Sequence, residues 1–144
     1  MKALVVYDSV YGNTKLVAEE VASELGKGVR ALSVAEVKEK DLAGLDLLVV
    51  GCPNTILGWM PSEKTSAFLS NIKPGQLKGM KVAAFDTHVR ILHFHNAGRK
   101  IAAALQSAGG SLVGEPAGFI MEDMKGPLAC DALNKAKDWA STLR

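Results

Sequence analysis

The chain has 144 residues, a formal net charge of +2 and a hydrophobic fraction of 48%. A chain of this length suits one domain with its own core, so we expect a single domain over residues 1–144. The small net charge, without a basic stripe that includes aromatic residues, argues against a nucleic-acid partner. No apolar run approaches the ~18 residues of a membrane span, and we expect no signal peptide before the first strand.

Strands and helices are expected to alternate along the chain. We expect strands at residues 2–7, 29–33, 46–52, 81–85 and 112–121. We expect one helix at residues 14–25, one that begins at residue 62, one from residue 96 to the Gly109–Gly110 pair, and one at residues 131–143. A helical turn is expected at residues 34–40. The third strand is nearly all apolar, which predicts burial on both faces. Pro116 cannot donate to a strand ladder, so the last strand should lie at an edge. The last helix is expected to turn Leu133, Ala136, Ala140 and Leu143 toward the core.

This alternation predicts an α/β fold, a three-layer doubly wound five-stranded parallel sheet. The edge position of the last strand suits the strand order 2-1-3-4-5. Ligands of such sheets bind beyond the carboxyl ends of the strands, at the switch point between the first and third strands. The loops after the first, third and fourth strands should therefore converge there.

The first of these loops, residues 8–14, joins an apolar strand to an amphipathic helix. A helix start presents outward N–H groups and the positive end of the helix dipole, and both favour an anion. Gly12 permits a close backbone approach, and Ser9, Asn13 and Thr14 supply side-chain donors. The loop therefore predicts a phosphate site. The alternative is a polar turn that binds nothing.

The stretch VVYDSVYGNTKLVAEEV resembles the phosphate-loop signature of the flavodoxin family. The order of elements, GCP after the third strand, and GPL before a final helix that contains AKDWA extend this resemblance over essentially the whole chain. The resemblance implies a flavodoxin-like fold and FMN as the cofactor. It also implies that the FMN phosphate is held by Ser9, Val10, Tyr11, Gly12, Asn13 and Thr14.

By the same resemblance, the other two loops flank the isoalloxazine ring. In the loop after the third strand, Trp59 would stack on the ring, or would instead be a core anchor or a surface contact, and Gly58 would turn its peptide toward flavin N5. The loop after the fourth strand lacks the tyrosine usual in flavodoxins, so Phe94 or His93 would stack instead. The implied flavin-binding residues of the two loops are Pro53, Asn54, Thr55, Ile56, Leu57, Gly58 and Trp59, and Asp86, Thr87, His88, His93, Phe94 and His95.

Two further expectations concern charge and cysteine chemistry. The region after the fourth strand carries Arg90, Arg99 and Lys100 against Asp86, and positive surroundings favour a reduced, anionic flavin. We therefore expect a higher redox potential than in acidic flavodoxins.

All three histidines of the chain lie in the loop after the fourth strand. No cysteine or carboxylate is placed beside His93 and His95, so no metal site is expected. Cys52 is expected to be a buried free thiol, and a cytoplasmic location follows.

The sequence leaves three functional hypotheses open. The first is an FMN-binding electron carrier between partner proteins, although a pI of about 8.5 differs from the acidic faces usual in such carriers. The second is an FMN-dependent oxidoreductase that acts on a quinone or another small acceptor, with His88, His93 or His95 as proton donors. The third is a binding domain that kept the fold and lost the flavin. The expected partner is thus a redox partner protein or a small electron acceptor.

Overall fold

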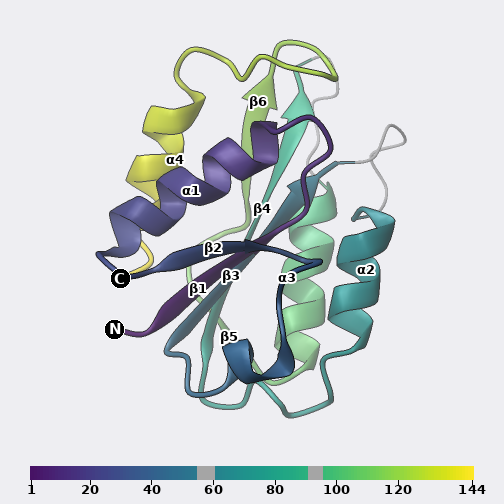
Figure 1. Ribbon diagram of the computed structural model, residues 1–144, viewed down its shortest axis with the longest axis vertical. Helices are drawn as coiled ribbons and strands as arrows, with labels where there is room; N and C mark the ends of the chain where they lie inside the picture. Colours follow the sequence, from purple (N-terminus) through teal and green to yellow (C-terminus); the bar gives the residue numbers. More distant parts are fainter. Residues whose placement is uncertain (55–60, 91–95) are drawn as a thin grey trace.

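A parallel sheet organises the molecule (Figure 1). Apolar side chains cover both of its faces. The computed structural model describes residues 1–54, 61–90 and 96–144. Its strands are β1 (Ala3–Tyr7), β2 (Arg30–Ser33), β3 (Leu47–Pro53), β4 (Lys81–Val89), β5 (Ser111–Leu112) and β6 (Ala117–Met121). The order is β2-β1-β3-β4, and both β5 and β6 pair in parallel with β4. The predicted strand order and doubly wound class are confirmed.

Helices cover both faces of the sheet, giving three layers (Figure 1). One face carries α1 (Asn13–Leu25) and α4 (Ala132–Ser141), and the other carries α2 (Glu63–Ser70) and α3 (Asn96–Ser107). Between β2 and β3 lies only a short 3₁₀ turn, η1 (Glu39–Leu42). Among the described residues, no helix is long and apolar enough to cross a membrane.

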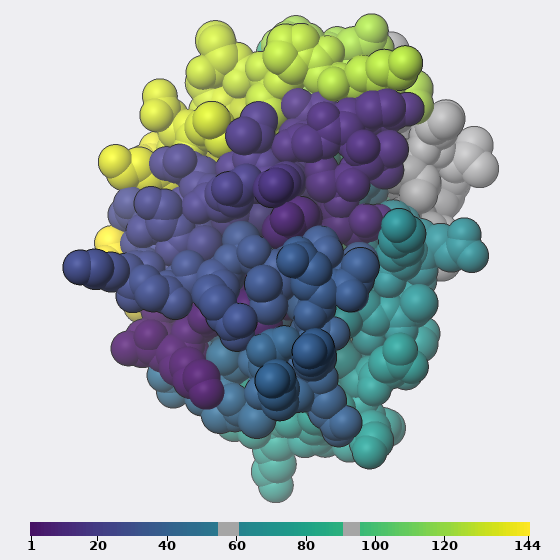
Figure 2. All heavy atoms as spheres, viewed as in Figure 1, coloured from purple at the N-terminus to yellow at the C-terminus, as the bar shows by residue number. Residues whose placement is uncertain are grey.

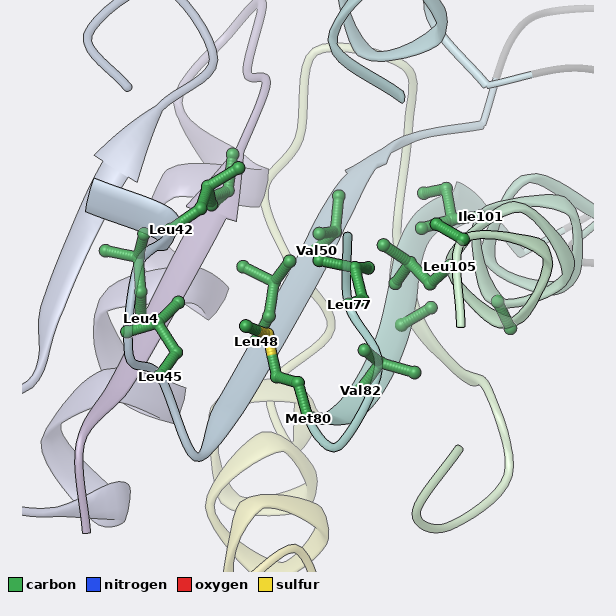
Figure 3. Packing of buried hydrophobic residues seen from close by; sticks show 14 of the residues in the cluster. Leu4, Leu42, Leu45, Leu48, Val50, Leu77, Met80, Val82, Ile101 and Leu105 are labelled. Carbon is green, nitrogen blue, oxygen red and sulfur yellow. The ribbon is translucent and has the colours of Figure 1, made fainter. Parts of the chain in front are cut away.

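The core consists of two clusters because successive residues of a strand point to opposite faces. In β3, Leu48 and Val50 belong to the cluster beneath α3, which also contains Leu77, Ile101 and Leu105 (Figure 3). Leu47 and Val49 belong instead to the cluster beneath α1 and α4. A near-continuous apolar strand is therefore buried on both sides.

An aromatic cluster packs the edge of the sheet against α4. The rings of Phe85, Phe119 and Trp139 meet edge to face, with centroids 5.9–6.0 Å apart. The Phe85 ring also lies over Gly51, where a Cβ atom would overlap it. Gly51 thus lets β4 place a large ring against the neighbouring strand β3.

The expected last strand is divided into two. Residues 112–121 were expected as one strand, but β5 pairs with the first residues of β4 and β6 with the last five. Pro116 lies between β5 and β6, where its missing N–H interrupts the ladder. The edge position is confirmed, and the continuity of the strand is not.

Two other expectations are corrected. The fourth strand continues to Val89 instead of ending at Phe85, because β6 provides a pairing partner for Phe85 to Val89. Asp86, Thr87 and His88 are therefore strand residues, although their polarity suggested a loop. In the last helix, Leu133 is exposed, whereas Ala136 and Ala140 are buried as expected; Leu143, which follows the helix, is also buried.

Candidate functional site

The candidate site lies at the carboxyl ends of β1, β3, β4 and β6, where the chain enters α1. Ser9 organises this entry: its Oγ accepts hydrogen bonds from the N–H groups of Gly12 (3.0 Å) and Lys15 (3.3 Å). Gly12 has a φ of 95°, in the left-handed region that glycine adopts readily. Because the Ser9 oxygen accepts both N–H groups, its own hydroxyl proton remains available to a ligand.

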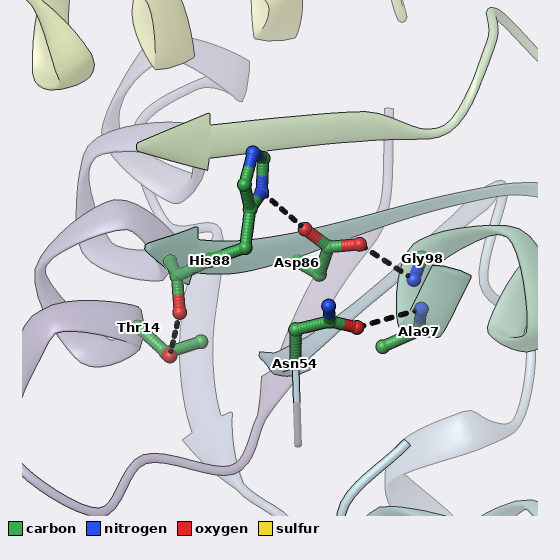
Figure 4. A network of polar contacts seen from close by, with 7 residues as sticks. Thr14, Asn54, Asp86, His88, Ala97 and Gly98 are labelled. Carbon is green, nitrogen blue, oxygen red and sulfur yellow. Dashed lines mark hydrogen bonds and ion pairs between the residues drawn. The ribbon is translucent and has the colours of Figure 1, made fainter. Parts of the chain in front are cut away.

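A pair of threonine hydroxyl groups lies beside this loop. Thr14 on α1 and Thr87 on β4 are both buried, and their Oγ1 atoms are 2.8 Å apart (Figure 4). One hydroxyl donates to the other, so the pair retains one proton for a third group. The pair also joins the start of α1 to the neighbouring strand end.

The backbone adds further donors at the same place. Within the described chain, the N–H groups of Asn13 and Thr14 have no acceptor, as is usual in the first turn of a helix. They point at the space that the helix dipole makes favourable for negative charge. This donor set fits a phosphate group, which offers only acceptor oxygens.

The loop residues contribute in different ways. The side chains of Val10 and Tyr11 are exposed, at 68% and 54%. The Asn13 side chain is buried, and its Nδ2 donates to the carbonyl oxygen of Lys125 (3.1 Å). The six residues assigned from the sequence are thus together, and Ser9 and Thr14 contribute aliphatic hydroxyls there.

A small pocket of about 20 Å³ marks the meeting point of these elements. The pocket is lined by residues of the loop after β1, of the end of β3, of β4, and of the end of β6 and the loop after it. Its lining residues are Ser9, Val10, Tyr11, Asn13, Thr14, Pro53, Thr87, Met121 and Met124. Pro53 and Thr87, expected from the sequence near the flavin, therefore share one pocket with the phosphate loop.

Three other expected residues form a separate polar cluster at the start of α3 (Figure 4). Asp86 is fully buried; its Oδ2 accepts from the Gly98 N–H (2.9 Å) and its Oδ1 lies 3.0 Å from Nδ1 of His88. The side-chain oxygen of Asn54 accepts from the Ala97 N–H (3.0 Å). Because strand residues alternate, Asp86 and His88 face α3 while Thr87 faces α1.

Comparison with known proteins identifies the family. The family model for flavodoxin matches residues 5–140. This chain belongs to the flavodoxin family. A flavodoxin from Clostridium beijerinckii is 31% identical over 87 residues, which cover 58% of this chain and 62% of that protein.

Solved flavodoxin structures share the fold over nearly the whole chain. A flavodoxin from the domain Archaea superposes with a TM-score of 0.84 at 21% identity, covering 99% of this chain and 96% of its own. Oxidised flavodoxin 2 from Bacillus cereus has a TM-score of 0.83 at 21% identity, covering 99% and 97%. Flavodoxins bind FMN and transfer electrons, which confirms the family and the cofactor expected from the sequence.

The net positive charge near the end of β4 is smaller than the residues of the loop after β4 alone would give. Glu122, which follows β6, forms an ion pair with Arg90, with 2.6 Å between Nη2 and Oε1. The hydrogen bond to Arg90 lowers the pKa of the Glu122 carboxyl and raises the pKa of the Arg90 guanidinium. The charge expected from the sequence after the fourth strand did not include Glu122, because Glu122 follows β6 and is distant in the sequence.

The two thiols of this flavodoxin differ in environment. Cys52 near the end of β3 is fully buried and Cys130 is exposed, and neither forms a disulfide. Burial raises the pKa of Cys52 to about 11, although hydrogen bonds from Ser62 and Thr65 lower it in part. The expected buried free thiol at Cys52 is confirmed.

Some expected residues lie outside the part that the structure describes, and two pocket residues were not expected. The first group comprises Thr55, Ile56, Leu57, Gly58, Trp59, His93, Phe94 and His95. Their roles stay predictions. Met121 and Met124 line the pocket but were not assigned from the sequence. The rule that ligands bind beyond carboxyl strand ends applies equally to β6 and would have indicated them.

Proposed function

We propose that this flavodoxin carries electrons between partner proteins with FMN held at the start of α1. The observation that carries the proposal is the convergence of Ser9, Thr14 and Thr87 hydroxyls on the N–H groups of the first helical turn. Bound FMN would supply the electron-accepting and electron-donating chemistry. The protein supplies the position, the polarity and the shielding of that group.

In this proposal the phosphate is bound by neutral donors. Ser9 directs its hydroxyl proton outward because its oxygen is occupied by the N–H groups of Gly12 and Lys15. The Thr14–Thr87 pair contributes a second hydroxyl proton, and the helix start contributes N–H groups. Hydrogen bonds from several such donors to a charged phosphate are individually stronger than those between neutral groups. An arginine in the loop is therefore not required.

The ring-flanking roles of the second and third loops remain part of the proposal. We retain Trp59 and Phe94 or His93 as the residues that contact the isoalloxazine. Asn54 and Asp86 support them indirectly, because both bind the start of α3 and so fix the strand ends from which the loops leave. His88 is held beside Asp86, so we propose a positioning role in that cluster instead of flavin contact.

FMN titration of the flavin-free protein tests the proposal. We expect one FMN to bind per chain with quenching of flavin fluorescence. The loaded and chemically reduced protein should then pass electrons to cytochrome c, and it should not oxidise NADH by itself. Absence of FMN binding at micromolar concentrations would overturn the proposal and would favour a flavodoxin-fold domain that has lost its cofactor.

The Asp86–His88 pair favours an FMN-dependent oxidoreductase as the second candidate. A buried carboxylate that orients an imidazole is an arrangement used for proton transfer. This function requires steady turnover of NAD(P)H with a quinone by the FMN-loaded protein, and a large decrease in the His88→Asn variant. Electron transfer to cytochrome c without such turnover supports the carrier.

We also propose a cytoplasmic location, which the thiols support. Cys130 is exposed and unpaired. Exposed free thiols persist in reducing compartments and tend to be oxidised outside them. Fractionation of cells with an antibody against the chain tests this location.

A further inference from the structure

The loop between β6 and α4, residues 122–131, lies against the phosphate loop. Figure 1 shows it above the start of α1, and Figure 2 shows its atoms, in yellow-green, directly beside the purple atoms of the N-terminal region. The hydrogen bond from Asn13 Nδ2 to the carbonyl oxygen of Lys125 joins residues 112 positions apart in the sequence. The first turn of α1 and this loop are thus in direct contact.

The contact depends on Gly126 and places Lys125 beside Tyr11. A Cβ atom on Gly126 would lie 2.7 Å from the Asn13 side-chain oxygen, so only glycine permits this approach. The Lys125 Nζ lies 5.7 Å from the centroid of the Tyr11 ring. Within the described chain, Lys125 has no ion-pair partner. The Lys125 ammonium group therefore lies beside Tyr11 of the phosphate loop, and the Lys125 backbone contacts Asn13, the first residue of α1.

The loop has internal support for this position. The Glu122 N–H donates to the Pro127 carbonyl (2.9 Å), and the Ala129 N–H donates to the Ile120 carbonyl (2.8 Å). Glu122 is also held by Arg90 at the end of β4. Asp123, the neighbouring acid, accepts from the Met124 N–H through Oδ1 (2.7 Å). The backbone that carries Lys125 is thus fixed on both sides.

Met121 and Met124 line the same pocket as Ser9 and Thr14. The pocket of about 20 Å³ has room for roughly one water molecule, so a phosphate requires a wall to move outward. Met124 is 47% exposed and has a flexible unbranched side chain, so it is able to move outward. The donor side of the pocket is instead held by hydrogen bonds.

We propose that residues 121–126 form a second wall of the phosphate site, with Lys125 as the residue that selects the dianionic phosphate of FMN. This inference rests on the proposed FMN site at α1. The neutral hydroxyls and N–H groups bind the phosphate oxygens but leave the negative charge of the phosphate in place. The positive charge of Lys125 balances part of that negative charge. The wall thus makes the site specific for FMN over riboflavin, which has the same ring and ribityl chain without the phosphate.

The test compares FMN and riboflavin binding to Lys125→Met and to a matched control. Lys81→Met removes the same charge from an exposed lysine at the first residue of β4, the opposite end of the strand from the site. We expect Lys125→Met to weaken FMN binding about three- to tenfold and to leave riboflavin binding unchanged. FMN affinity should also depend less on salt concentration in this variant, because one screened attraction is absent. Lys81→Met should bind both flavins like the natural chain, and Lys125→Arg should retain FMN affinity.

The outcomes separate this inference from the proposed function. If the natural chain does not bind FMN, the proposed function fails. If the natural chain binds FMN and Lys125→Met binds it with the same affinity and salt dependence, only the second wall is wrong. Equal weakening of FMN and riboflavin in Lys125→Met would also overturn it, because that result indicates loss of loop packing instead of loss of charge. The ³¹P resonance of bound FMN gives an independent readout and should shift in Lys125→Met only.

Discussion

At the residue scale, Ser9 combines a structural and a binding role. Its oxygen closes the loop by accepting two backbone N–H groups, so its own proton remains free to donate to a ligand. We expect Ser9→Ala to weaken FMN binding about tenfold to a hundredfold, the effect of losing a hydrogen bond to a charged group. Fluorescence titration measures this change. Ser70→Ala removes an exposed hydroxyl of α2 and should have no effect on FMN affinity.

Riboflavin distinguishes the two roles of Ser9. If the hydroxyl binds the phosphate, Ser9→Ala should weaken riboflavin binding much less than FMN binding. An equal loss for both flavins would show that Ser9 acts only by shaping the loop.

The two cysteines provide a second prediction at this scale. Burial raises the pKa of Cys52 to about 11, whereas a cysteine in the unfolded chain has an ordinary pKa of 9.0. At pH 8 to 9, a thiol reagent should therefore label one thiol per native chain, at Cys130, and two thiols in denaturant. Above pH 9 the unfolded thiol ionises before the folded one, so Cys52 should lower the stability of the fold as pH rises toward 11. Rapid labelling of Cys52 in the native protein at pH 8 would contradict its burial.

At the element scale, the start of α3 depends on side chains from two strand ends. Asp86 from β4 accepts the Gly98 N–H, and Asn54 after β3 accepts the Ala97 N–H. Asp86→Ala should lower the free energy of unfolding by about 1–3 kcal/mol, because it leaves a buried N–H group without its acceptor. Urea unfolding followed by circular dichroism measures this loss. Asp138→Asn, which changes an exposed residue of α4, should leave the urea midpoint unchanged.

Which elements are predictable from sequence follows from where their pairing partners lie. The apolar runs of β1 and β3 and the helical period of α3 are local signals, and the structure confirms them. The polar end of β4 has no such local signal, because Asp86 and His88 are stabilised by α3 and by pairing with β6. Leu133 likewise fits a helical stripe, yet the neighbouring elements do not cover it.

At the scale of the whole molecule, the candidate site combines local and distant parts. The loop at residues 8–14 can be predicted from the sequence, because the strand, the glycine, the hydroxyl residues and the helix follow one another along the chain. Thr87 and Met121 reach the pocket, and the Lys125 carbonyl reaches Asn13, only through the strand order and the return of the chain from β6 to α4. The same reasoning explains Glu122, which follows β6 and reduces the positive charge near Arg90.

The ratio of the dissociation constants of riboflavin and FMN for the natural chain tests the central claim most directly. A site in which hydroxyls, helix N–H groups and Lys125 bind the phosphate should hold FMN at least about a hundredfold more tightly than riboflavin, because each charged hydrogen bond contributes about 1.5–3 kcal/mol. Equal affinities for the two flavins, or no binding of FMN, would contradict a phosphate site at the start of α1.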